Sequence, residues 1–516
     1  MKKLIQKKYR RLLWAGLLTG LALYVLVSLI VPPLAGTQRK SAARTKLPRP
    51  AAERVCLVDS NDDALRWRLR LIRSAQSEII LSTFDLRADN SGTDVIAALL
   101  DAAERGVQVR LIVDGINAQL HLCGNASFQA LAAHENAAVR LYNPLRLTRL
   151  WTANYRCHDK YLIVDRSAYL MGGRNTSDLF LGSGGTSRQN RDRDVVVYAD
   201  GSEDGSAATL LGYFEGIWQL DTNREFRANG KKRRVQSAAS TLAARWAALE
   251  DTQSLSPIDW AAETIPAAGV RVLHGDCRAR NKEPLLLNTL TALMQSGRES
   301  VVLQTPYIIC NRAMYDALDA AAGGAAQVRI LTNAPQSGAN PWGCADYLNQ
   351  KNNILQTGVW VCEWSGEDSM HTKSILIDDR LSLIGSFNWD MRSAYLDTEL
   401  MLLVDCPALN AALREQTEEM MRQSRLVSPD GTETAGAAYI APERSPLKAA
   451  LQAVIRSLIR PFGSCCKPPS RAGCGADSVP KFCLRSRIIQ ANRKKTCDNM
   501  KHKKRRRLLH AGFCGV

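Results

Sequence analysis

The feature that most constrains this chain is one spaced pattern that occurs twice. In each copy, one residue separates a histidine from a lysine; then come four residues, an aspartate, six residues, a glycine, two residues and an asparagine. The copies are His158, Lys160, Asp165, Gly172 and Asn175, and His371, Lys373, Asp378, Gly385 and Asn388. With average residue usage, one copy matches by chance at about 10⁻⁷ per starting position. Two copies with identical spacing therefore indicate a duplicated structure that carries a duplicated site.

The segments in front of the two copies follow the same order. Apolar runs typical of buried strands alternate with segments of helical periodicity. They lie at 77–85, 93–105, 107–114 and 139–142 before the first copy, and at 300–306, 314–322, 327–333 and 359–362 before the second. This internal repeat predicts an α/β fold with two pseudo-symmetric halves, each with a mainly parallel central sheet.

The positive charge of the chain lies at its two ends. The formal net charge is +18, of which residues 1–54 carry +11 and residues 464–516 carry +12, so the central region carries −5. A groove for nucleic acid needs clustered Lys and Arg in the folded body, and we therefore expect no nucleic-acid partner. No two of the fourteen cysteines have the C-x-x-C spacing of a zinc site, and we expect neither a metal nor a cofactor.

The first 35 residues are predicted to form a membrane anchor. Six Lys and Arg residues at 2–11 precede an uncharged apolar stretch at 12–31, and about 20 such residues cross the hydrocarbon of a bilayer as a helix. A cleaved secretory signal is the alternative, although its apolar region is usually shorter. Because basic residues flank both ends, the positive-inside rule leaves the orientation open.

Composition divides the rest of the chain into segments. We predict a basic linker at 36–54, a first half at 55–199, a connecting segment at 200–270, a second half at 271–427, a linker with an amphipathic helix at 428–463 and a basic disordered tail at 464–516. The helix has apolar residues at helical spacing from Leu447 to Phe462 and basic residues on its other face. Such a helix either lies on an anionic membrane surface or packs on the body. The glycine-rich segment at 182–187 is predicted to be a mobile loop, or else to hold a head-group phosphate.

The residue types of the pattern suit displacement at a phosphodiester. Residues two apart on a strand point to the same face of the sheet, so each histidine is expected to lie on the same face as its lysine. Together, two halves offer two imidazoles, two ammonium groups and two amides. One imidazole can attack phosphorus and the other can transfer protons, while the lysines and amides hold the anionic oxygens.

The remaining positions of the pattern are expected to shape the backbone. Asp165 and Asp378 have the opposite parity from the histidines, which favours a role in the turn over contact with the reacting atom. Gly172 and the 385–386 pair, which includes Ser386, allow the backbone to approach closely. Asn175 and Asn388 are then placed to act as amide donors.

The duplicated pattern resembles that of the phospholipase D superfamily over residues 55–427. GGRN at 172–175 and GSFNWDMRSAYLDTE at 385–399 are most similar to bacterial cardiolipin synthases, as is the N-terminal span. The resemblance implies one active site in which the His, Lys and Asn side chains of both copies converge. It also implies an acidic residue after each copy that orients the histidine, a role that Glu399 fits in the second half and Asp194 in the first. His158 is the preferred nucleophile, and the bacterial cytoplasmic membrane is the expected location.

The resulting hypothesis is phosphatidyl transfer. One phosphatidylglycerol would donate its phosphatidyl group to a histidine, and a hydroxyl of a second phosphatidylglycerol, or of another phospholipid, would resolve the phosphohistidine. A phospholipase D that uses water and yields phosphatidic acid needs the same residues, so that alternative stays open. A metal-independent nuclease and a non-enzymatic phosphate-binding protein are further alternatives. The expected partners are phospholipids and the membrane, and the oligomeric state stays open.

Overall fold

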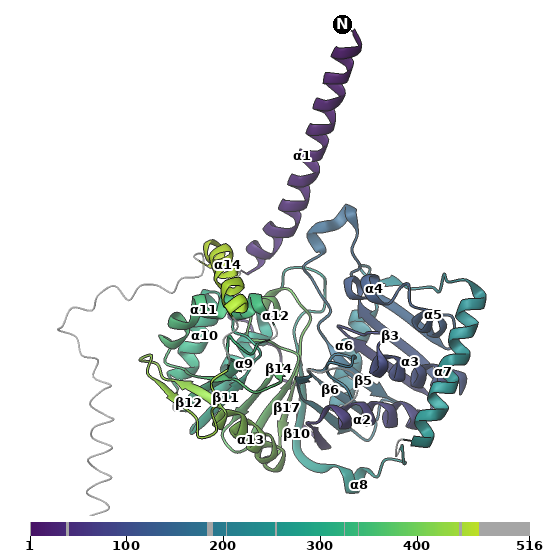
Figure 1. Ribbon diagram of the computed structural model, residues 1–516. Helices are drawn as coiled ribbons and strands as arrows, with labels where there is room; N and C mark the ends of the chain where they lie inside the picture. The colour runs from purple at the N-terminus through teal and green to yellow at the C-terminus, as the bar shows by residue number, and fades with distance from the viewer. Residues whose placement is uncertain are drawn as a thin grey trace, which may run out of the picture. The chain divides into compact units, whose positions relative to one another are not determined.

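The computed structural model (Figure 1) describes residues 2–37, 41–182, 189–202, 204–252, 255–324, 326–338, 340–442 and 446–463. The tail at 464–516 and most of the glycine-rich loop, at 183–188, lie outside these residues. Within them, seventeen strands form one sheet, and two short strands form a second one. The repeated strand runs of the sequence therefore build a single sheet.

The first half of the sheet comprises eight strands. In spatial order they are β9 (Arg224–Glu225), β4 (Ala137–Tyr142), β3 (Gln108–Asp114), β2 (Glu78–Thr83), β5 (Lys160–Val164), β6 (Ala168–Gly172), β8 (Asp194–Tyr198) and β1 (Ala51–Val58). β1 then pairs antiparallel with β10, the first strand of the other half, so that the sheet continues without a break.

The second half comprises nine strands. From this seam outward they are β10 (Ile265–His274), β17 (Leu400–Asp405), β16 (Leu381–Gly385), β15 (Ser374–Ile377), β11 (Ser300–Gln304), β12 (Gln327–Asn333), β13 (Trp360–Trp364), β18 (Ser424–Val427) and β19 (Glu433–Ala435). The pairing order β4-β3-β2-β5-β6-β8 of the first half matches β13-β12-β11-β15-β16-β17 of the second. Both copies of the pattern thus occupy corresponding strands.

The sheet is mixed, which corrects the prediction of mainly parallel central sheets. Among its described strands, only β2-β3-β4 and β11-β12-β13 run parallel to their neighbours. The helix-connected strands of the sequence repeat are these parallel ones. The strands that carry the pattern are joined by tight turns, and strands joined in this way pair antiparallel.

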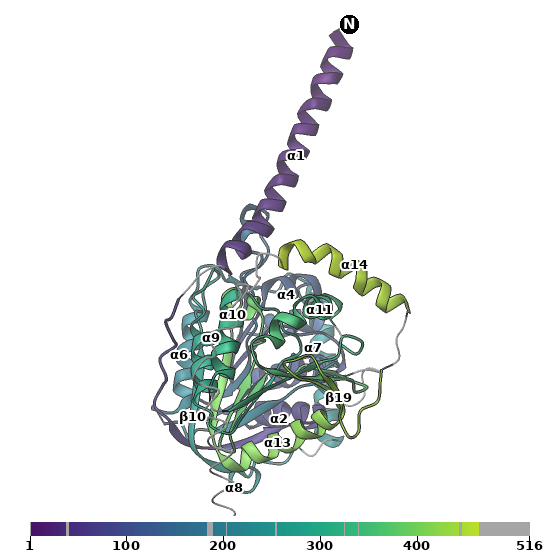
Figure 2. The same cartoon turned by 90° about the vertical axis from the view of Figure 1, so that its left-hand side faces the viewer.

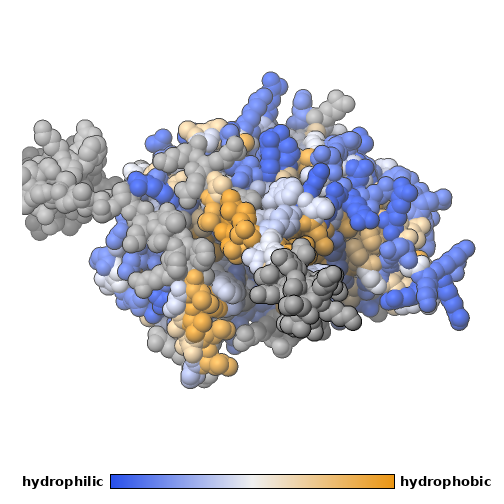
Figure 3. All heavy atoms as spheres, turned by 90° about the horizontal axis from the view of Figure 1, so that it is seen from above, coloured by the Kyte–Doolittle hydropathy of each residue, from blue (hydrophilic) through white to orange (hydrophobic). Residues whose placement is uncertain are grey.

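Two helices mark one end of the molecule in both views of the ribbon (Figures 1 and 2). α1 (Lys2–Gly36) contains a candidate membrane span, Trp14–Gly36, which is apolar and almost entirely exposed. α14 (Pro446–Gly463) lies across the body, against α11 (Pro341–Leu355). Figure 3 looks onto this end and shows hydrophobic patches between hydrophilic side chains.

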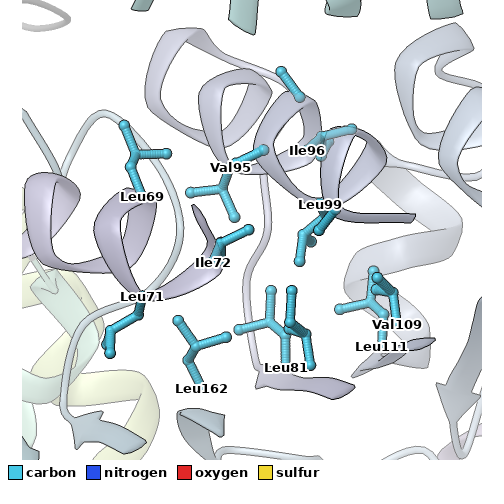
Figure 4. Packing of buried hydrophobic residues seen from close by; sticks show 14 of the residues in the cluster. Leu69, Leu71, Ile72, Leu81, Val95, Ile96, Leu99, Val109, Leu111 and Leu162 are labelled. Atoms are coloured by element: carbon cyan, nitrogen blue, oxygen red, sulfur yellow. The ribbon is translucent and has the colours of Figure 1, made fainter. Parts of the chain in front are cut away.

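Helices cover both faces of the sheet. In the first half, α2 (Asn61–Ser74), α3 (Asn90–Glu104), α5 (Ala126–Ala132) and α7 (Lys232–Thr252) bury one cluster of apolar side chains (Figure 4). In the second half, α9 (Leu285–Gln295), α10 (Arg312–Ala322) and α11 bury another. A third cluster lies under α6 (Ser206–Trp218) and α13 (Pro407–Arg422) and includes strand residues of both halves, such as Ile80 and Val302. This shared core holds the halves together beneath the site.

Candidate active site

Each copy of the pattern forms a β-hairpin with the same layout. The histidine and lysine lie at the entry of β5 or β15, and the glycine and asparagine lie at the exit of β6 or β16. The entry and exit of an antiparallel hairpin are neighbours. In the second hairpin, the N–H of Gly385 donates to the carbonyl oxygen of Lys373 at 3.1 Å. The hairpin therefore brings the histidine, lysine and asparagine to the same end.

Asp165 and Asp378 lie at the turn of each hairpin, at the opposite end from the histidine. Their φ angles are 48° and 49°, in the left-handed region where aspartate is tolerated better than most residues. Their carboxylates accept backbone N–H groups at the start of β2 and β11, from Gln76, Ser77 and Glu78 and from Arg298, Glu299 and Ser300. Burial raises the pKa of each carboxyl, but these backbone donors outweigh it and bring the pKa below its usual range. Both aspartates hold backbone, and neither contacts a histidine.

His158 meets Glu399 where the two halves form a parallel bridge. The bridge joins Cys157 to Thr398. Because it is parallel, the residues that follow, His158 and Glu399, lie side by side. Nδ1 of His158 is 3.0 Å from Oε1 of Glu399. The backbone N–H of His158 donates to Oγ1 of Thr398 at 3.0 Å. An acid of the second half therefore orients the histidine of the first.

His371 meets Asp192 at an equivalent place. β14 (Ser369–Met370) pairs parallel with β7 (Asn190–Arg191), directly before these two residues. Nδ1 of His371 is 2.6 Å from Oδ2 of Asp192, and Nζ of Lys373 is 3.6 Å from the same oxygen. Here an acid of the first half orients the histidine of the second, so neither histidine is supported by its own half alone.

Asp194, which the sequence assigned to the histidine of the first half, has a different environment. Its buried carboxylate lies 3.0 Å from Arg68 and 3.4 Å from Arg174. The assignment is wrong because β8 begins at Asp194, and Asp192 lies in the loop that crosses to the other half. Glu399, which the sequence assigned to the histidine of the second half, contacts His158 instead, and Asp192 contacts His371.

The two acids are held in different ways. The hydroxyls of Ser386 and Ser393 donate to the two carboxylate oxygens of Glu399, each at 2.5 Å. In the first half, Gly173 stands where Ser386 stands in the second. A side-chain carbon on Gly173 would lie 2.3 Å from Oδ1 of Asp192, so the glycine is needed for the close approach of this carboxylate.

Both lysines are buried beside their histidines. Nζ of Lys160 donates to the carbonyl oxygen of His158 at 2.6 Å and lies 5.2 Å from the centre of the Phe84 ring. Nζ of Lys373 donates to the carbonyl oxygen of His371 and lies 3.1 Å from its Nε2. Burial lowers the pKa of both lysines to about 8. They carry positive charge at neutral pH and lose it more readily than an exposed lysine.

The charges of the two halves affect one another. Burial, and then its neighbour Lys373, lowers the pKa of His371 to about 3. Burial, and then Lys160, lowers the pKa of His158 well below its usual value. Each histidine is also influenced by the lysine of the other half. An anion between the lysines would raise the pKa of both imidazoles, because opposite charge favours their protonated form. The site is therefore suited to an anionic substrate.

The two acids differ in charge state. Burial raises the pKa of Glu399 to about 8. Although burial also acts on Asp192, Lys373 and His371 bring its pKa down to about 2. At neutral pH the carboxyl beside His371 is therefore ionised, whereas the carboxyl beside His158 titrates close to neutrality.

The asparagines of the pattern each have a buried polar atom without a partner. Among the described residues, Oδ1 of Asn175 and Oδ1 of Asn388 accept no hydrogen bond. Buried polar groups are rarely left unpaired. Because the oxygen and nitrogen of an amide can exchange places by rotation, each asparagine can present its N–H groups at this position. An anionic oxygen would satisfy them.

Two aromatic side chains complete the surroundings of the histidines. Phe84 packs on His158 and Phe180 on His371 in T-shaped arrangements, with ring centres 5.0 and 4.9 Å apart. Sequence reasoning missed both, and Asp192 as well. Phe84 directly follows β2, the buried strand that pairs with β5. Its position at the end of a buried strand is the one sequence signal that could have indicated its role.

The sequence matches the family model described as "Cardiolipin synthase, PLD-like domain" over residues 69–218 and 290–421. These ranges include both hairpins and both acids that contact a histidine. The chain belongs to this family of the phospholipase D superfamily.

Individual relatives are distant but extensive. Cardiolipin synthase C of Escherichia coli is 27% identical over 396 residues, which are 68% of this chain and 81% of that protein. Cardiolipin synthase A of Erwinia tasmaniensis is 25% identical over 381 residues, or 72% of this chain and 70% of that protein. The crystal structure of a phosphatidylserine synthase from Haemophilus influenzae has a TM-score of 0.58 at 16% identity and covers 82% of this chain and 97% of that one. The likeness of these structures shows a common fold.

Proposed function

We propose that the protein is a membrane-bound phosphatidyltransferase of the cardiolipin synthase type, with phosphatidylglycerol as donor and a second phosphatidylglycerol or another phospholipid as acceptor. One observation carries the proposal: two sets of histidine, lysine and asparagine are each completed by an acid of the other half. The names of the relatives and the candidate anchor α1 favour a lipid substrate over other phosphodiesters.

The reaction proceeds by two displacements at phosphorus. Nε2 of His158 attacks the phosphorus of phosphatidylglycerol, a P–N bond forms, and the P–O bond to the glycerol head group breaks. The negative charge of the bound phosphate raises the pKa of His371 and favours its protonated form, and His371 gives this proton to the departing glycerol oxygen. It then accepts the proton of the acceptor's hydroxyl, whose oxygen attacks phosphorus while the P–N bond breaks. The products are cardiolipin and glycerol, and both histidines return to their starting states.

The other groups of the site act on charge and position. Lys160 and Lys373 hold the non-bridging phosphate oxygens, whose charge shifts in the transition state. The amides of Asn175 and Asn388 donate to the same oxygens. We assign proton transfer to His371 because the ionised carboxylate of Asp192 stabilises its protonated form.

One experiment tests the proposal directly. The purified full chain is incubated in mixed micelles with phosphatidylglycerol labelled in its acyl chains, and the lipids are separated. Labelled cardiolipin with released glycerol is the expected result. Phosphatidic acid alone would indicate a hydrolase with water as acceptor, and cleavage of DNA without any change in the lipid would indicate a nuclease.

Trapping the covalent intermediate distinguishes the roles of the two histidines. A labelled phosphatidyl ester of p-nitrophenol serves as donor here, because its leaving group departs without a proton from His371. After a quench in dodecyl sulfate at neutral pH, in which the P–N bond survives, the His371→Ala variant should carry a labelled phosphatidyl group, whereas His158→Ala should carry none. Turnover should be lost in both variants. Label on the His158→Ala protein would reverse the assignment of the nucleophile, and full turnover by either variant would refute the shared site.

A further inference from the structure

The loop that leads to His158 is tied to the middle of α1. The hydroxyl of Tyr24 donates to the carbonyl oxygen of Leu147 at 2.9 Å. The same hydroxyl accepts a hydrogen bond from the backbone N–H of Leu150 at 3.4 Å. The amide of Asn154 donates to the carbonyl oxygen of Leu29 at 2.9 Å. The loop, residues 145–154, includes the short 3₁₀ helix η1 (Leu147–Thr152) and rises beside α1 in Figure 1. It therefore lies level with the candidate membrane span.

The length of α1 sets the depth of this loop. Arg11 is the last charged residue before the apolar stretch, and Tyr24 follows it by thirteen residues, or about 20 Å of helix. The hydrocarbon of a bilayer is about 30 Å thick. If the hydrocarbon begins at Arg11, it extends about 10 Å beyond Tyr24 toward the body. The tip of the loop then lies inside the lipid boundary.

The surface of the loop is suited to that position. Leu147 is 77% exposed, and Trp151 and Leu145 are 44% and 41% exposed. Arg146 and Arg149 alternate with them, and long basic side chains beside apolar ones reach back to lipid phosphates. Part of the tip's backbone is paired: the N–H of Arg149 donates to the carbonyl oxygen of Arg146, and Tyr24 pairs with Leu147. Such pairing lowers the cost of placing backbone polar groups near lipid.

α14 presents a second apolar surface at the same end of the molecule. The side of α14 that faces the body packs on it: the amide of Gln452 donates to the carbonyl oxygen of Pro335 at 2.5 Å, and Ile455 is buried. Its outer side carries a stripe of large exposed apolar residues at helical spacing, Leu447, Leu451, Val454 and Leu458. Of the two alternatives that the sequence left for this helix, the structure shows packing on the body for one side, and the exposed stripe is free to contact a further surface.

We infer that the 145–154 loop and the outer stripe of α14 form one membrane-contact surface, which inserts into the acyl boundary of the bilayer that α1 enters. The occupant is phospholipid, because the surface continues the candidate span through direct hydrogen bonds and combines apolar tips with basic residues. The loop ends four residues before His158. Its insertion therefore holds the first histidine at the lipid surface, where a membrane substrate need not leave the bilayer.

Lipid crosslinking tests this surface without any need for turnover. Photoreactive p-benzoylphenylalanine replaces Leu147 or Val454 in the full chain, which is reconstituted into vesicles of phosphatidylglycerol and phosphatidylethanolamine. Leu18, in the free part of α1, is the positive control. Ile265, which is apolar and 39% exposed, is the negative control. It begins β10 and closely follows α8 (Trp260–Glu263), which lies at the end opposite α1 in Figures 1 and 2. After irradiation, lipid adducts are measured by mass spectrometry.

Adducts at Leu147 and Val454 should exceed those at Ile265 by about tenfold, since only a site in contact with lipid reacts. Adducts at Leu18 but not at Leu147 would overturn the inference for the loop, and their absence at Val454 would overturn it for α14. Absence at all three would remove the membrane premise. None of these outcomes depends on the proposed phosphatidyl transfer.

A second experiment uses activity to separate surface from chemistry. The double variant Leu147→Glu with Trp151→Glu should lose about tenfold in rate on phosphatidylglycerol vesicles, because its carboxylates oppose insertion. On the same lipid dispersed in detergent it should match the unmodified chain, and Ile265→Glu should be unaffected on both. An equal loss on vesicles and in detergent, or no loss on either, would contradict the inference.

Discussion

Asp192 and Asp194 lie two positions apart, yet they are predicted to separate catalysis from stability. In Asp192→Asn, the imidazole of His371 loses the negative charge that stabilises its protonated form, so kcat should fall by about a hundredfold or more. In Asp194→Asn, Arg68 and Arg174 lose a buried partner, and removal of such a partner costs about 3–5 kcal/mol of folding free energy. Steady-state kinetics and urea unfolding measure the two effects.

The two variants serve as each other's control. Asp194→Asn that remains folded should retain most of its kcat. Asp192→Asn should unfold at a urea concentration closer to that of the unmodified chain. The reverse pattern, with kcat lost in Asp194→Asn alone, would return the orienting role to Asp194.

The lysines predict the alkaline limit of activity. The pKa of both Lys160 and Lys373 is lowered to about 8 by burial, so both are charged below this pH and lose their charge as the pH rises through it. Because the transition state requires that charge, kcat/KM should fall above about pH 8, whereas an exposed lysine would remain charged to about pH 10. A pH profile in detergent, with circular dichroism as a check on folding, measures this. A rate that stays constant up to pH 10 would show that the lysines are not required in charged form.

At residue scale, the sequence was sufficient for the pattern and insufficient for its partners. The spacing of His158, Lys160 and Asn175 is local, and a hairpin reproduces it. The choice between Asp192 and Asp194 depends on strand register. The glycine that ends each hairpin is opposite Asp194 in the first half but opposite Met401 in the second, which matches Glu399 with Asp192. No local pattern sets that register.

At the level of elements, the hairpin turns should affect stability and leave the chemistry intact. Asp165→Ala and Asp378→Ala remove three backbone hydrogen bonds to a carboxylate and place alanine at positive φ. Each should lower the free energy of unfolding by about 2 kcal/mol. Asp→Asn, which tolerates this φ and keeps an acceptor, should cost less. Urea unfolding gives the order, and a large fall in kcat in the folded variants would instead place the aspartates in the reaction.

The pH dependence of this stabilisation follows from the same contacts. The folded-state pKa of both carboxyls is lowered by backbone donors, despite the opposing effect of burial. Their contribution is therefore present above the usual aspartate pKa and is lost as the pH falls through the folded-state value. The difference between each Ala variant and the unmodified chain should shrink below about pH 4.

The sequence predicted which segments are strands better than it predicted how they pair. Apolar runs separated by helices predict parallel pairing, and β2-β3-β4 and β11-β12-β13 follow it. The hairpins that bear the pattern and the seam between β1 and β10 are antiparallel. A buried strand has the same apolar composition in either direction, so composition alone does not determine the direction.

At the scale of the whole molecule, the two halves should unfold together. The sheet is continuous through β8, β1, β10 and β17, and the cluster under α6 and α13 includes strand residues of both halves. Each half also supplies the acid that the other's histidine requires. Hydrogen exchange in increasing urea should therefore give one midpoint for the amides of β3 and β12, which lie in different halves. Val270→Ala, a fully buried substitution at the seam, should lower both midpoints equally, by about 2 kcal/mol. The exposed Ile440→Ala should change neither, and two separate midpoints would show that the halves are independent units that only meet at the site.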